Sequence, residues 1–300
     1  MSKSTIPAIC FGEVLWDILP DGPQPGGAPL NVAYHLNKLG VPASIVSKIG
    51  NDVNGTKLKD LLDRWQIDSQ FLQLDNEFNT GEVIASINNG NDISYEILYP
   101  VAWDYIEKLN EVSKKINSST YIIYGSLASR NEMTRDSLFD LLENDGIKVF
   151  DINLRPPFIG KDLLKSLLLK ADIVKFNKAE LEMVIELFQG PAEEETVQIH
   201  FVMDLFKIHE VIVTKGENGA SFYRGDTVWH TGGRPVEVLD TIGSGDSFLA
   251  AFLAGHYLNE NPETILKNAI AMGAFIATKK GGCPEYRLNE FKEFKSQELK

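Results

Sequence analysis

The sequence predicts an α/β protein with a mostly parallel sheet flanked by helices. Short apolar, β-branched runs alternate with amphipathic segments along most of the chain, which is the pattern of βα units. Hydrophobic residues make up 43% and charged residues 24% of the 300, an ordinary globular composition. No interdomain linker or internal repeat interrupts the pattern. We therefore expect one domain spanning residues 1–300.

The elements follow one another in a regular order. A buried strand over 9–15 precedes a helix over 30–39, and a strand over 43–49 precedes a helical stripe over 58–65. Residues 80–87 and 93–98 are strand-like and joined by a turn sequence at 88–92, which predicts a hairpin. Four further strands are expected at 121–124, 148–152, 173–176 and 211–214. A second hairpin is expected at 220–230, and two helices at 244–258 and 262–278 close the chain.

Charge and composition exclude several classes of function. The formal charge of -13 disfavours nucleic acid and anionic membrane surfaces as partners. Two cysteines cannot build a disulfide framework or a cysteine-rich zinc site. The first seven residues do not form a signal peptide, and the apolar run 248–254 is too short to cross a bilayer, so we expect a cytoplasmic protein. The common NTPase phosphate loop, the metalloprotease HExxH, the hydrolase GxSxG and the dinucleotide GxGxxG motifs are absent.

The most informative segment runs from Asp240 to Asp246, with sequence DTIGSGD. A strand ends there, two glycines follow, and a helix begins. The glycines let backbone amides approach an anion, and the helix start adds unpaired amides and a positive dipole end. Asp246 beside such an anion hole could accept a proton from a substrate hydroxyl. A tight turn followed by an acidic helix start explains the segment equally well.

A second glycine-containing segment, GGAPLNVA at 26–33, also precedes a helix. The glycine pair could be a hinge or a close-approach surface, and Asn31 in the first helical turn could bind a polyol. A plain loop-to-helix start with Pro29 in the first turn is the simpler interpretation.

Together these segments resemble the ribokinase-like carbohydrate kinases, the phosphofructokinase-B family. Two more elements match that family in order, NKAE at 177–180 and TKGENG at 214–219, so the resemblance covers nearly the whole chain. GEVLWD at 12–17, DINLRP at 151–156 and KKG at 279–281 are most similar to the fructokinase branch. The resemblance implies a ribokinase-like fold with a small β-sheet lid made of about 17–28 and 71–103. It also implies a possible homodimer through that lid.

The resemblance assigns roles residue by residue. Asp246 would be the base, the amides of Gly243, Ser244, Gly245 and Asp246 the anion hole, and Arg155 a phosphate-neutralising cation. Sugar hydroxyls would be held by Asp17, Gly27 and Asn31. The ATP site would be lined by Thr214, Gly216 and Gly219, with Mg²⁺ positioned through water by Asn177 and Glu180. A monovalent cation, K⁺, would be held by Asp240, Ile242 and Gly281.

Each of these assignments has a structural alternative. Asp17 could be an exposed strand-end carboxylate, the pair Asn177 and Glu180 a helix cap, and Arg155 a surface salt-bridge partner.

Three positions depart from the family pattern. Ile270 stands where many relatives carry an Asn near the adenine, with Asn268 two residues earlier. The segment 99–104 lacks the usual Arg and carries Trp103, which we expect in the lid against the sugar. Ser244 replaces the usual Ala between the glycines.

The sequence thus predicts an ATP-dependent sugar kinase acting on a primary hydroxyl, with fructose the expected acceptor. 2-Keto-3-deoxygluconate, ribose or a riboside are alternative acceptors. A catalytically silent sugar or nucleotide sensor on the same fold is the alternative from another class.

Overall fold

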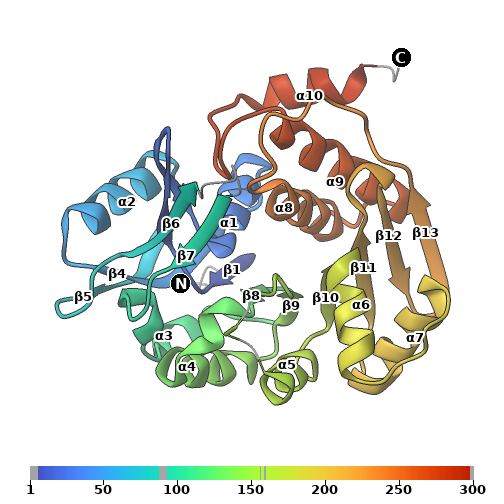
Figure 1. The fold of residues 1–300 in the computed structure, drawn as a ribbon, viewed down its shortest axis with the longest axis horizontal. Helices are drawn as coiled ribbons and strands as arrows, with labels where there is room; N and C mark the ends of the chain where they lie inside the picture. The colour runs from blue at the N-terminus through green and yellow to red at the C-terminus, as the bar shows by residue number, and fades with distance from the viewer. Residues whose placement is uncertain (1–5, 88–92, 156, 159, 298–300) are drawn as a thin grey trace.

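The computed structural model describes residues 6–87, 93–155, 157–158 and 160–297. Its centre is a nine-stranded sheet in the order β13-β12-β11-β10-β9-β8-β1-β4-β5 (Figure 1). Every neighbouring pair from β5 to β11 is parallel, and only the pairs β11–β12 and β12–β13 are antiparallel. The predicted mostly parallel sheet is confirmed. The strands are β1 Ala8–Phe11, β4 Ala43–Gly50, β5 Asp68–Asp75, β8 Tyr121–Gly125, β9 Ile147–Asp151, β10 Ile173–Asn177, β11 Glu210–Thr214, β12 Ala220–Arg224 and β13 Thr227–Thr231.

The parallel register places polar residues side by side at one edge of this sheet. Asp151 at the end of β9 is paired with Lys175 of β10, and Asn177 at the end of β10 with Thr214 of β11. Ligand sites of open α/β sheets lie beyond this carboxyl-terminal edge. The register therefore gathers four chemically useful side chains where such a site is expected.

Helices cover both faces of the sheet (Figure 1). Against one face lie α1 Ala28–Lys38, α2 Val53–Arg64, α8 Ser244–Tyr257, α9 Pro262–Ala277 and, outside them, α10 Leu288–Ser296. The other face is covered by α3 Asn110–Ser113, α4 Glu132–Leu142, α5 Lys161–Leu168, α6 Lys178–Leu187 and α7 Glu195–Phe206. Each face has its own buried apolar cluster. None of the helices among the described residues is long and apolar enough to cross a membrane.

The helix that begins at the 240–246 segment is deeply buried. Every residue of α8 from Ser247 to Gly255 is buried, because α8 packs between α1, α9 and the sheet. Apolar residues on all sides of a helix are typical of such a central position. The start of α8 is consequently held rigidly at the carboxyl-terminal edge of the sheet.

A separate four-stranded sheet stands off the large one (Figure 1). Its order is β3-β2-β6-β7, with β2 Leu15–Leu19, β3 Gly22–Gly26, β6 Gly81–Ile87 and β7 Ile93–Ile97. The predicted hairpin is confirmed as the antiparallel pair β6 and β7; its turn, 88–92, lies outside the described residues. This small sheet matches the lid expected from the resemblance.

Two predicted boundaries are wrong. Residues 71–75 belong to β5, the edge strand of the large sheet, so the second lid segment begins at Gly81. The single strand expected over 9–15 is two strands in different sheets, because the chain turns at Gly12, whose φ of 138° is favourable for glycine alone. Apolar patterning does not distinguish one long strand from two short ones.

Candidate active site

The start of α8 forms a cluster of backbone amides. Gly243 precedes the helix in the left-handed region, with φ 74°, and a side chain there would collide with Gly282. The first amide that donates within the helix is that of Ser247, to the Gly243 carbonyl at 2.8 Å. The Ser244 amide donates to the Thr241 carbonyl at 3.2 Å. The amides of Gly243, Gly245 and Asp246 are therefore the ones available for an anion.

Asp246 lies in this first turn and is partly buried. Its Oδ2 accepts a hydrogen bond of 2.7 Å from Nδ2 of Asn31, which comes from the start of α1. Burial, and then the negative charge of Asp151, raise the pKa of Asp246 to about 6. The carboxylate is ionised at neutral pH and basic enough to accept a proton. The structure thus brings together Asn31 and Asp246 from segments 215 residues apart.

A buried ion pair lies directly beneath the amides. Nζ of Lys175 donates to both carboxylate oxygens of Asp151, at 2.8 and 2.9 Å. A Cβ on Gly245 would lie 3.5 Å from the same Nζ. Burial alone would lower the pKa of Lys175, but the charge and hydrogen bonds of Asp151 more than offset it, so the pKa is raised. The Lys175 ammonium therefore lies close to these amides, with its charge balanced by the Asp151 carboxylate.

Sequence reasoning included Asp151 in the DINLRP segment without giving it a role, and it did not single out Lys175. A lysine inside the otherwise apolar strand sequence IVKF was the available signal, since a charged side chain is almost never fully buried unless it is paired.

Asp17 and Glu13 add two more carboxyl groups to the region. Asp17, on β2 of the lid sheet, packs its carboxylate against the Cα of Gly26. Burial, with the charge of Asp246 next, raises the pKa of Asp17 to about 6. Glu13 is fully buried, and its Oε1 accepts from the amide of Ala28 at 3.2 Å. Its Oε2 has no partner among the described residues, and burial raises the pKa of Glu13 to about 7.

Two other predicted residues lie around these carboxyls. Arg155 is exposed, and its positive charge lowers the pKa of Glu13, Asp17 and Asp246, so the guanidinium is within electrostatic reach of all three. Gly27 has φ 108°, and a side chain there would collide with the carbonyl of Glu13. Gly27 therefore permits close packing of the loop.

A cavity of about 550 Å³ opens on the other side of the amides. Thr214, Gly216 and Gly219, which we expect at the ATP site, all line this cavity, and Ser244 and Gly245 form its inner end. Its apolar wall includes Val236, Val238, Phe248 and Ile270. Both the volume and the apolar wall suit a nucleoside. Asn268 points elsewhere, bonded to Glu260 and Lys295.

Comparison with known proteins shows the family of this chain. The family profile of the pfkB carbohydrate kinases matches residues 22–287. The chain belongs to the pfkB family of carbohydrate kinases.

The matches to individual relatives cover most of this carbohydrate kinase. It is 29% identical to probable fructokinase-5 of Arabidopsis thaliana, over 92% of this chain and 93% of that one. It is 27% identical to a fructokinase of Klebsiella pneumoniae, over 90% and 93%. A crystal structure of Vibrio cholerae fructokinase with fructose, ADP and potassium has a TM-score of 0.81 at 24% identity, over 98% and 99% of the two chains.

The residues predicted to bind Mg²⁺ and K⁺ in this carbohydrate kinase form two separate hydrogen-bonded groups. Asn177 and Glu180 form a capping box at the start of α6: Oδ1 of Asn177 accepts from the Glu180 amide at 2.9 Å, and Oε2 of Glu180 from the Asn177 amide at 2.8 Å. Oδ1 and Oδ2 of Asp240 accept from the amides of Ile242 and Gly281, at 3.0 and 2.9 Å. The members of each group thus lie close to one another, and each group already has a structural role.

Trp103 is not in the lid, contrary to the sequence prediction. It lies in the short 3₁₀ helix η1 Ala102–Tyr105, is fully buried, and packs against Gly81. The guanidinium of Arg130 lies 3.9 Å from the centre of its ring. Burial of so large an apolar ring stabilises the body beneath the lid and removes the indole from any substrate.

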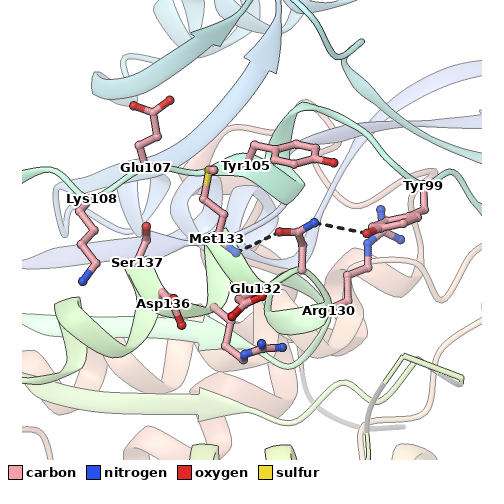
Figure 2. A pocket seen from close by; sticks show the side chains of 11 residues that line it. Tyr99, Tyr105, Glu107, Lys108, Arg130, Glu132, Met133, Asp136 and Ser137 are labelled. Carbon is pink, nitrogen blue, oxygen red and sulfur yellow. Dashed lines mark hydrogen bonds between the residues drawn. The ribbon is translucent and has the colours of Figure 1, made fainter.

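Arg130 also borders a wide depression of about 830 Å³ between Tyr99 and α4 (Figure 2). No predicted site residue lines that depression.

Proposed function

We propose that this carbohydrate kinase transfers the γ-phosphoryl group of ATP to a primary hydroxyl of fructose. The observation that carries the proposal is the first turn of α8, which presents both the Asp246 carboxylate and the free amides of Gly243 and Gly245. A nucleoside-sized cavity ends at Ser244 and Gly245 of this turn. Fructokinases among the relatives support fructose as the acceptor.

The chemistry follows from these positions. Asp246 accepts the proton of the sugar hydroxyl as its oxygen forms a bond to the γ-phosphorus. The bond between that phosphorus and the β–γ bridging oxygen breaks, and ADP leaves. The amides and the nearby Lys175 stabilise the negative charge on the transferring group. Asp17 and Asn31 orient the sugar, and Arg155 neutralises phosphate charge from the solvent side.

Asn177 and Glu180 fit an Mg²⁺ ion that is held through water. No group of three acidic, histidine or cysteine side chains among the described residues could bind a metal directly. Asn177 and Glu180 would hold hydrated Mg²⁺, since each oxygen that accepts an amide keeps a second lone pair. When bound, the ion would neutralise negative charge on the phosphates of ATP. Asp240 and the backbone carbonyls of Ile242 and Gly281 offer oxygen ligands suited to K⁺.

An acceptor panel tests the function. ADP release should be measured with fructose, ribose, glucose, 2-keto-3-deoxygluconate and a riboside, using Asp246→Asn as the matched inactive control. We expect fructose to have the highest kcat/KM, and Asp246→Asn to lower turnover by about 10²–10⁴-fold. Another winning acceptor would replace fructose but keep the kinase. Binding of sugar and ATP without ADP release would indicate a sensor.

We also propose a cytoplasmic homodimer. ATP is available in the cytoplasm, and both cysteines are free and buried. The edge strand β7 of the lid carries Tyr95, 56% exposed, on a surface that a second lid could cover. Sedimentation velocity should give twice the chain mass, and a monomer at micromolar concentration would contradict the dimer.

A further inference from the structure

The amide of Asn31 stands between the proposed base and a buried cysteine. Its Nδ2 donates to Oδ2 of Asp246 at 2.7 Å, and its Oδ1 accepts from the Cys283 thiol at 3.2 Å. Asn31 and Cys283 are both buried, with 4% and 8% of their surfaces exposed. An asparagine amide can turn over by exchanging its oxygen and nitrogen. In the turned-over orientation its oxygen would face the Asp246 carboxylate, which also only accepts.

The segment that carries Cys283 is fixed on α1. Oη of Tyr34 donates to the carbonyl of Pro284 at 2.7 Å, and Nε2 of His35 donates to the carbonyl of Gly282 at 2.8 Å. Burial lowers the pKa of His35 to about 4, so its ring is neutral and remains in this tautomer. A Cβ on Gly282 would lie 2.6 Å from the Asn31 amide nitrogen. The thiol is thus presented to Asn31 by a rigid support.

We propose that Cys283 is a positioning residue for the base: its thiol donates to Oδ1 of Asn31 and so keeps the Asn31 NH₂ group on Asp246. This inference rests on the proposed role of Asp246. It adds a cysteine that no pattern in the sequence connected with catalysis. The thiol touches no substrate and acts through the amide alone.

The consequence is a pH dependence of Asp246. The Asn31 hydrogen bond lowers the pKa of this carboxyl, so its loss raises that pKa and protonates the base at a higher pH. Several other groups have charges that interact with the charge of Asp246. They lie on the strands β2, β9 and β10, in the loops that follow β1 and β9, and in the 281–284 segment. They are Asp151, Lys175, Glu13, Arg155, Asp17 and Cys283. All of them are unchanged by a substitution at position 283 except the thiol itself.

Cys283→Ala tests the inference against two matched variants. Cys10→Ala removes the other buried thiol, which is in β1 and outside the site. Cys283→Ser keeps a hydroxyl donor for Asn31. In Cys283→Ala, we expect the acidic limb of the kcat/KM profile for the sugar to move up by roughly half a pH unit or more, about what one hydrogen bond contributes to a pKa. Cys10→Ala and Cys283→Ser should keep the wild-type limb.

The carboxyl pKa is also read directly by ¹³C NMR of aspartate-labelled protein, with Asp246→Asn assigning the signal. This measurement needs no turnover, so it tests the thiol's role even if no sugar in the panel is phosphorylated. The same Asp246 pKa in wild type and Cys283→Ala overturns the inference while leaving the kinase intact. A lower kcat in Cys283→Ala without movement of the limb also overturns it, because packing alone would produce that result.

Discussion

At the scale of single residues, Asp17 is the sharpest test of the sugar site. Its carboxylate lies on β2 and is ionised at neutral pH, with a pKa of about 6. Asp17→Asn keeps the shape but removes the charge, and a hydrogen bond to a charged group is worth about 1.5–3 kcal/mol. We expect kcat/KM for the sugar to fall roughly ten- to hundred-fold, with the KM for ATP within about twofold.

The control for Asp17→Asn is Asp21→Asn, which removes an exposed carboxylate from the same hairpin. Initial-rate kinetics on both variants should separate them. Equal effects of the two substitutions, or a loss confined to ATP, would remove Asp17 from the sugar site.

What the sequence could predict at this scale depended on local spacing. Asp246 and Gly245 could be selected as candidates because helix starts, glycines and carboxylates within seven residues form one pattern. The pairing of Asp151 with Lys175 could not be predicted, because it depends on the register of β9 and β10, which spacing along the chain does not reveal. Asn177 and Glu180 were recognised with both their capping and metal-binding interpretations; the capping box is observed.

At the scale of one element, Gly245 tests the phosphate site that we propose at the start of α8. Gly245→Ala should not harm the helix, because alanine is the better helix former and its Cβ would meet Lys175 Nζ only at 3.5 Å. That Cβ would instead occupy the approach to the amides. We expect an unchanged or higher Tm, and kcat/KM for ATP lowered roughly hundred-fold. Gly160→Ala, in open space before α5, is the matched control. Normal ATP kinetics in Gly245→Ala would show that the amides bind no phosphate.

The lid shows where element-level prediction ended. Its hairpin could be predicted from turn residues, but β5 and Trp103 were assigned to the wrong sheet and the wrong surface. Both are neighbours of lid segments in the sequence, but in space both belong to the body of the protein. Their places depend on packing, of β5 on β4 and of the Trp103 ring beneath β6. Local propensity does not contain that information.

At the scale of the whole molecule, alternation of strand and helix was enough to predict the parallel sheet, because a βα unit can pack only a few ways. The order of the nine strands and the convergence of Asn31 on Asp246 required either the structure or the family resemblance. Convergence has an energetic consequence. Glu13, Asp17 and Asp246 are gathered in one partly buried region of a chain whose formal charge is -13.

Buried carboxyl groups should make the ligand-free protein less stable as pH rises. The pKa of Glu13 is about 7 in the fold against an ordinary 4.5, so the folded state holds this proton more tightly than the unfolded chain. Stability from this group is therefore highest below pH 4.5 and declines as pH rises to 7, a total of about 3 kcal/mol. Glu13→Gln cannot ionise and keeps an acceptor for the Ala28 amide. In urea unfolding we expect it to exceed wild type by up to about 3 kcal/mol at pH 8 and to match it near pH 4.5. The exposed Glu77→Gln should change neither value, and a Glu13→Gln protein no more stable than wild type at pH 8 would mean that Glu13 is already stabilised as a carboxylate.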